Sequence, residues 1–207
     1  RHKMTGLMYA AQEGLPTLVK YRIDQGANVR IKMRDDVDDK ERSALTALHF
    51  AAQSIRTKSK SLETIKILLE AGADPNAKDK YGRTPLYYCI FSDGPDRHYN
   101  IAGFILRGIG MLIKKGAQID SRDVSSYTLI EQVVRLSPRN YIYYFIYLME
   151  QGASTMRVKA LSKIHGNYER IKVFLPLELG VYYSIEEFRS YRLPNKGLWY
   201  GEKENEN

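Results

Sequence analysis

The chain has 207 residues, of which 43% are hydrophobic and 27% charged, a composition typical of a globular protein. Its formal net charge is +8, and half of that excess lies in residues 1–33, which carry six basic and two acidic side chains. The charge indicates an acidic partner or a solvated basic face, and the absence of a base-reading or phosphate-binding motif argues against nucleic acid. No apolar run approaches the ~18 residues of a membrane span, so no such span is expected.

The single cysteine, Cys89, predicts a protein without disulfides. One cysteine cannot form an internal bridge, which fits a reducing compartment such as the cytoplasm. A cysteine nucleophile would need a base and an orienting group, and no motif supplies them. We therefore expect Cys89 to be a small buried residue. No basic leader with an apolar core opens the chain, so no secretory signal is expected.

A two-part motif recurs four times in the same order. Its first part is a Thr followed by small and apolar residues, at 5–11, 46–52, 84–90 and, more weakly, 128–134. Its second part is a Gly-Ala pair followed by a polar residue, at 24–28, 70–74, 114–118 and 150–154. The Thr suits a helix N-cap, and the Gly suits the left-handed residue that ends a helix. Each copy therefore predicts two helices and a Gly stop.

Prolines and apolar runs place helices within these copies. Pro16 is predicted to open the second helix of the first copy, and Pro85 the first helix of the third, where a missing amide costs nothing. Residues 101–113 predict a long apolar outer helix. Its internal glycines, among them Gly108 and Gly110, should weaken it by about 1 kcal/mol each.

The motif resembles the ankyrin repeat, whose signature is TPLHxAA followed by LLxxGADxN at a period of about 33 residues. His49 stands where the family's histidine forms local hydrogen bonds that organise the turn. The resemblance implies an all-α ankyrin-repeat solenoid, in which helix-turn-helix units share one elongated core and finger loops project from it. The predicted ankyrin-repeat domain is 1–155, with repeats at about 4–33, 46–77, 84–121 and 128–155.

The spacing within the repeats predicts several long loops. In the family about 21 residues separate the Thr from the Gly, and about 12 separate that Gly from the next Thr. The first repeat has 21, whereas the other three have 26, 32 and 24. The excess falls around residues 55–61, 92–100 and 137–140, between the two helices of a repeat. A finger insertion at 34–45 adds eight more residues between the first two repeats.

Three of these loops carry residue types that bind ions. The basic loop 55–61 would either hold a phosphate or simply be solvated. The finger insertion 34–45 is rich in aspartate but lacks the central Gly and terminal Glu of an EF-hand, which predicts a mobile charged loop. His98 in loop 92–100 has no second His or Cys at ligand spacing, so no zinc site is expected. The sequence therefore predicts no metal and no cofactor.

Residues 156–207 match no repeat, and we expect a C-terminal helical cap at 156–200 followed by a disordered tail at 201–207. Residues 141–149 form a helix that is apolar on nearly every side, which predicts that another segment, most simply the C-terminal one, covers it. Residues 175–179 (LPLEL) resemble the start of an F-box, which would make the chain a ubiquitin-ligase adaptor, but Gly180 stands where the helix should continue.

The resemblance implies a module that binds a protein partner through its concave face and fingers. Tyr9, Phe50 and Tyr88 hold one equivalent position in three repeats, and they either line the groove as an aromatic stripe or pack between repeats. Aromatic and Arg side chains dominate interface energies. The other candidate partner-binding residues are Gln12, Glu13, Gln53 and Phe91 on the inner helices, with Lys80, Tyr81, Arg83 and Tyr127 on the fingers.

Two alternative classes differ from a simple binding module. An enzyme would need a phosphate loop, a nucleophile elbow or metal spacing, and none is present. His165, Glu169 and Glu178 could build a C-terminal site, but nothing in their spacing selects them, so no catalytic activity is expected. The chain could also be the recognition arm of a longer effector or scaffold protein.

Overall fold

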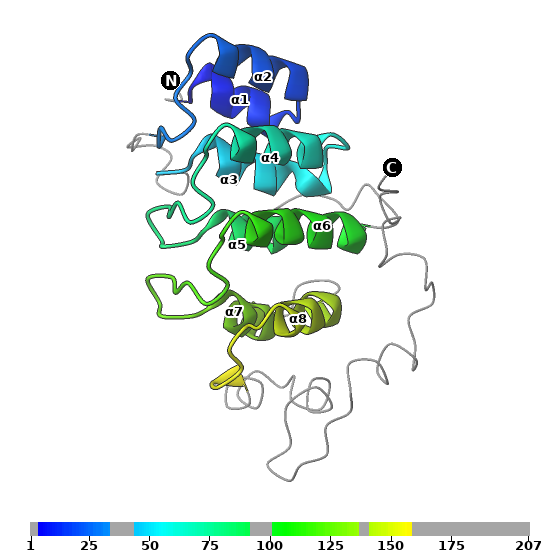
Figure 1. The fold of residues 1–207 in the computed structure, drawn as a ribbon. Coiled ribbons are helices and arrows are strands. Elements are labelled where there is room, and N and C mark those ends of the chain that lie inside the picture. The colour runs from blue at the N-terminus through cyan, green and yellow to red at the C-terminus, as the bar shows by residue number, and fades with distance from the viewer. Residues whose placement is uncertain (1–3, 34–43, 92–100, 137–140, 159–207) are drawn as a thin grey trace.

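A computed structural model of the protein describes residues 4–33, 44–91, 101–136 and 141–158. These residues form eight α-helices in four pairs and, among themselves, no strand. The pairs are stacked in chain order, and the loops that join the second pair to the third and the third to the fourth project from the same side (Figure 1). This arrangement confirms the predicted all-α stack of helix-turn-helix units. The pairs are α1 (Gly6–Gln12) with α2 (Pro16–Asp24), α3 (Ala47–Gln53) with α4 (Ser61–Glu70), α5 (Pro85–Ile90) with α6 (Ile101–Lys114), and α7 (Leu129–Leu136) with α8 (Tyr141–Glu150).

The recurring Thr and Gly residues set the ends of these helices as the sequence predicts. Thr5, Thr46 and Thr84 are N-cap residues with extended backbone, and the Oγ1 atom of Thr5 accepts a hydrogen bond from the Met8 amide at 3.2 Å. The Gly after each outer helix has a positive φ of 81–89°, a conformation that costs Gly little. These positive-φ glycines are Gly26, Gly72, Gly116 and Gly152.

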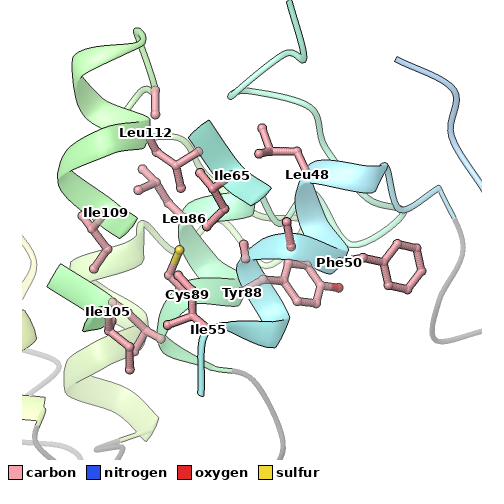
Figure 2. Close-up of a cluster of buried hydrophobic side chains, with 14 of the residues drawn as sticks. Leu48, Phe50, Ile55, Ile65, Leu86, Tyr88, Cys89, Ile105, Ile109 and Leu112 are labelled. Atoms are coloured by element: carbon pink, nitrogen blue, oxygen red, sulfur yellow. The ribbon is translucent and has the colours of Figure 1, made fainter. Parts of the chain in front are cut away.

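Small residues on the inner helices allow close stacking and a continuous core. Among the inner helices, α1 packs against α3 and α3 against α5. Among the outer helices, α2 contacts α4, α4 contacts α6, and α6 contacts α8. Ala10, Ala51 and Cys89 are fully buried. Figure 2 shows Cys89 within an apolar cluster drawn from α3 to α6. Cys89 is thus the small buried residue that the sequence predicts, and burial raises the pKa of its thiol to about 12.

The glycines of α6 permit close packing rather than interrupting the helix. α6 is continuous from Ile101 to Lys114 despite them. A Cβ atom added to Gly108 would lie 2.5 Å from Cδ1 of Ile55, and one added to Gly110 would lie 2.7 Å from the hydroxyl of Tyr147. The expected loss of helix propensity is therefore accompanied by closer contact with α8 and with the segment after α3.

The insertion at 55–61 is packed against the next repeat, so the expectation of a solvated loop is wrong for its first residues. It begins in η2 (Ser54–Arg56), a single 3₁₀ turn in which Ile55 and Arg56 are buried. The Nη2 atom of Arg56 donates a hydrogen bond of 2.7 Å to the carbonyl of Ile90, the last residue of α5. A cation at the carbonyl end of a helix is favourable, which explains why this basic residue faces inward.

Removing the Arg56 side chain should weaken the contact between the second and third repeats. We expect Arg56→Ala to lower the free energy of unfolding by about 1–3 kcal/mol, because the buried Ile90 carbonyl loses a charged donor. Urea denaturation measures this change. Lys60→Ala, a substitution at an exposed position in the same loop, is the matched control and should change stability by less than ~0.5 kcal/mol. Equal losses for the two variants would contradict the role given to Arg56.

Hydrogen bonds between successive turns hold the repeats in register. One position, four residues after each turn Gly, supplies them. Arg30 donates through Nε to the carbonyl of Gly72 at 2.9 Å, and Asn76 through Nδ2 to that of Gly116 at 2.9 Å. At the same position Asp120 accepts through Oδ1 from the Ser154 amide at 3.0 Å.

Several predictions lie outside the described residues. They concern most of the finger insertion and of the C-terminal cap, the loops at 92–100 and 137–140, the tail, the F-box-like stretch at 175–179, and the set His165, Glu169 and Glu178. Among the described residues, no three His, Cys, Asp or Glu side chains cluster as metal ligands. In the same part of the chain, every helix is too short or too polar to cross a bilayer.

Candidate functional site

The fingers before α5 and α7 share one tight turn. The amide of Asp79 donates to the carbonyl of Arg83, and the amide of Asp123 to that of Tyr127, each at 3.0 Å. The Val124 amide donates to the carbonyl of Tyr81 at 2.9 Å, which joins the two fingers. The fingers therefore form one continuous backbone surface beside the inner helices.

A carboxylate organises each turn, and it is buried in Asp79 and half-buried in Asp123. Oδ1 of Asp79 accepts from the amides of Tyr81 and Arg83, both at 2.8 Å. Oδ2 of Asp79 accepts from Nε of Arg83 and from the hydroxyl of Tyr88, both at 2.7 Å. Burial, together with the hydrogen bond to Asp79, raises the pKa of Tyr88 above its ordinary value.

The second finger repeats this arrangement. Oδ1 of Asp123 accepts from the amides of Ser125 at 2.9 Å and Tyr127 at 3.0 Å, while Oδ2 accepts from Nε2 of Gln132. Gln132 stands in its repeat where Tyr88 stands in the third repeat. Each finger is thus fastened to its own inner helix through a residue nine positions further along the chain.

These turns also contain left-handed residues at one equivalent position, two residues before the Thr. Gly82 has φ +74°, Ser126 has φ +63° and Ala44 has φ +62°. A Cβ atom disfavours this conformation in Ser126 and Ala44. We expect Ser126→Gly to raise the free energy of unfolding by several tenths to ~1 kcal/mol, measured by urea denaturation.

The reverse change is the control for that prediction. Gly82→Ala should destabilise the protein, because an added Cβ atom would lie 3.0 Å from the Val124 amide nitrogen as well as impose the disfavoured φ. A Ser126→Gly variant that is less stable than the parent would show that the Ser126 side chain is not strained.

His49 fixes the turn before α3 and contacts the next finger. Its Nδ1 atom accepts from the Thr46 amide at 3.1 Å, and its Nε2 atom lies 3.3 Å from the carbonyl of Arg83. With Nδ1 as acceptor, Nε2 carries the proton and donates to that carbonyl. Burial lowers the pKa of His49 to about 4, so the ring is neutral. The predicted local hydrogen bonding is confirmed.

Glu131 takes the place of this histidine in the fourth repeat. Its Oε2 atom accepts from the Thr128 amide at 3.0 Å, which closes a capping box at the start of α7. The same oxygen lies 3.4 Å from Nη1 of Arg122 and 3.6 Å from Nη1 of Arg157. A single buried carboxylate therefore faces two guanidinium groups.

Cationic side chains cover tyrosine rings around these two fingers. The Arg83 guanidinium carbon lies 4.5 Å from the ring centroid of Tyr81 and 5.2 Å from that of Tyr87. Lys80 lies 4.6 Å from the ring centroid of Tyr81. These distances fall within the range of cation–π attraction.

The same arrangement occurs at the next finger. The guanidinium carbons of Arg135 and Arg157 lie 5.0 Å and 5.8 Å from the ring centroid of Tyr127. A shallow hollow opens between the two fingers, with Arg83, Tyr87 and Tyr127 in its lining. The name Tyr–Arg patch is used below for this surface, which consists of Lys80, Tyr81, Arg83, Tyr87, Tyr127, Arg135 and Arg157.

The patch brings together the four finger residues named from the sequence and adds three more. Tyr87 occupies the histidine position of the motif, a signal that could have marked it. Arg135 is held in place by Gln132, whose Oε1 accepts from its Nε at 3.0 Å and from its Nη2 at 2.8 Å. Arg157 lies thirty positions after Tyr127, and no sequence pattern links the two.

The predicted aromatic stripe is not formed, and this is a correction. Phe50 is completely buried, and Tyr88 is 6% exposed because its hydroxyl is bound to Asp79 and its ring meets the edge of His49 at 5.4 Å. The alternative, packing between repeats, describes both residues. Tyr9, at 56% exposure, is the one member of the trio that faces solvent.

The remaining candidates lie at the C-terminal ends of the inner helices, whereas the fingers precede the N-terminal ends. Glu13 forms an ion pair of 2.7 Å with Lys58, and Gln12 and Gln53 are partly buried at the ends of α1 and α3. The ring of Phe91 lies 4.6 Å from that of Tyr87, so Phe91 borders the patch. The structure therefore does not bring the eleven candidates together into one site.

Comparisons with known proteins agree with the repeat pattern. A family model described as ankyrin repeats (3 copies) matches residues 7–123, more than half of the chain. The chain is 35% identical to human neurogenic locus notch homolog protein 1 over 82 residues, which are 40% of this chain and 3% of that protein. It is 33% identical to human B-cell lymphoma 3 protein over 91 residues, 44% of this chain and 18% of that protein. The chain thus matches less than a fifth of the length of either relative.

Proposed function

This chain belongs to the ankyrin repeat family, whose arrays are protein-interaction modules, and from that premise we propose that its Tyr–Arg patch binds a protein partner. The observation that carries the proposal is the gathering of Tyr and Arg side chains around a hollow between two neighbouring repeats. Tyr and Arg are the residue types enriched at the energetic centres of protein interfaces.

The patch is also held in a fixed conformation before any partner arrives. Asp79 and Asp123 hold the finger backbones through two amide hydrogen bonds each, and Gln132 holds the guanidinium of Arg135. A preorganised surface loses little conformational entropy on binding. This supports a specific contact at the patch rather than a loosely defined basic face.

A capture experiment tests the proposal. The full chain and its Lys80→Ala/Arg135→Ala variant would be used to capture and crosslink partners from a cytosolic lysate. The variant leaves the Asp79 hydrogen bonds intact, whereas substitution of Arg83 would not. We expect to find a partner that the variant captures at least ~10-fold less than the parent does. A decrease of that size corresponds to the loss of about one interface anchor residue.

Lys66→Ala/Lys115→Ala is the matched control, since both lysines are exposed on the outer helices or at their ends. Urea denaturation of all three proteins verifies equal folding. A partner captured equally by both variants would show that the patch is not the binding surface. If ligase subunits were among such partners, the F-box-like stretch at 175–179 would become the leading candidate. Cytoplasmic localisation and a role as scaffold or effector remain predictions.

A further inference from the structure

We infer that the occupant of the Tyr–Arg patch is an extended, acidic segment of the partner protein, with carboxylates facing Lys80, Arg135 and Arg157. The inference rests on the proposed function and specifies the chemistry of its ligand. Its basis is a difference in exposure between the acidic and the basic side chains of the two fingers.

Two of the three acidic groups of this region are buried, and all three already accept hydrogen bonds. The third, Asp123, lines the hollow and is partly exposed, and it accepts from two backbone amides and from Gln132. The Asp79 side chain is 0% exposed and Glu131 is 2% exposed. Oδ1 of Asp79 accepts from the Tyr81 amide, and its Oδ2 accepts from Arg83 and Tyr88. Oε2 of Glu131 accepts from the Thr128 amide. Asp79 and Glu131 therefore contribute little negative charge to the surface that a partner meets.

The basic groups are turned outward and exceed their internal partners. Arg122 and Arg157 are 47% and 46% exposed, and they share the one carboxylate of Glu131. Arg135 is bound to a neutral amide oxygen, and Lys80 is exposed over a tyrosine ring. Within the described residues, no carboxylate forms an ion pair with Lys80 or Arg135. The patch therefore has an excess of positive charge that an acidic ligand would balance.

The arrangement of the rings favours a peptide over a nucleic acid. Single-stranded nucleic acids bind by stacking bases on free aromatic faces. Here Lys80 and Arg83 lie over the ring of Tyr81, and Arg135 and Arg157 lie over that of Tyr127. A ligand therefore meets the cationic groups rather than the bare ring faces. Cationic groups form charge-assisted hydrogen bonds with carboxylates, which suits the acidic side chains of a segment lying across the two fingers.

Selection from a displayed library of random peptides tests the inference on the full chain. We expect the selected peptides to be rich in Asp and Glu. Their affinity should fall at least ~10-fold for Lys80→Gln/Arg135→Gln, and it should fall as salt is raised, because surface charge pairs are screened. Binding to the Lys66→Gln/Lys115→Gln control should be unchanged.

The outcomes separate this inference from the function on which it rests. Peptides that need the patch but are neutral or basic would overturn the inference and leave the binding surface standing. Failure to select any patch-dependent peptide would count against both. A short polyuridylate RNA serves as the competing probe. If it bound at the patch more tightly than every selected peptide, the acidic-segment inference would be wrong.

Discussion

Replacing Asp79 with Ala is expected to lower the free energy of unfolding by roughly 3–5 kcal/mol, the cost typical of removing one partner from a buried charge pair. The side chain is fully buried and pairs with Arg83 at 2.7 Å. Its loss would also leave two backbone amides and the hydroxyl of Tyr88 without an acceptor. Urea denaturation of parent and variant, monitored by circular dichroism, gives the change in the free energy of unfolding.

Two further variants divide this effect into its parts. Asp79→Asn keeps the shape and one acceptor oxygen but removes the charge, so a smaller loss of about 1–2 kcal/mol is expected. Asp123→Ala removes the equivalent carboxylate from the next finger. Among the described residues no guanidinium pairs with Asp123, so its loss should cost less than that of Asp79. Equal losses for Asp79→Ala and Asp123→Ala would show that the ion pair with Arg83 contributes nothing measurable.

The sequence was sufficient to predict the helix ends because single residue types determine them. Gly72, with φ +83°, marks the end of α4, and Pro16 marks the start of α2. Both signals reflect local backbone energetics, which a sequence records directly. The hydrogen-bonding role of His49 was implied instead by the resemblance to the ankyrin motif, and its Thr46 partner lies three residues away.

Exposure could not be predicted in this way, because it depends on neighbouring repeats. Tyr9 and Phe50 hold the same position in their repeats, yet the first is 56% exposed and the second fully buried. The basic sequence of loop 55–61 indicates a phosphate site or a solvated loop, but the guanidinium of Arg56 reaches the end of α5. Arg157 contacts a ring thirty positions away, a proximity that the repeat stack creates. The site therefore had to be read from the structure, whereas the fold did not.

Acidification should destabilise the protein through His49. Its pKa is about 4 in the folded state because of burial, against about 6.5 in an unfolded chain. Between these values the unfolded state binds a proton that the folded state does not, so stability is greatest above ~6.5 and falls as the pH drops. The slope is at most ~1.4 kcal/mol per pH unit, which amounts to roughly 3 kcal/mol across the window.

His49→Gln is the control that isolates this contribution, because every other side chain is the same in both proteins. The amide can replace part of the hydrogen bonding but does not titrate, so the variant should be less stable near neutral pH and less sensitive to acid. Urea denaturation at a series of pH values between ~7 and ~4.5 gives the two curves. We expect the two curves to converge as the pH falls, because the parent loses the stability that neutral His49 contributes and the variant lacks that contribution at every pH. Parallel curves, or an imidazole resonance of His49 that titrates near 6.5, would show that the ring is not held neutral by the stacked repeats.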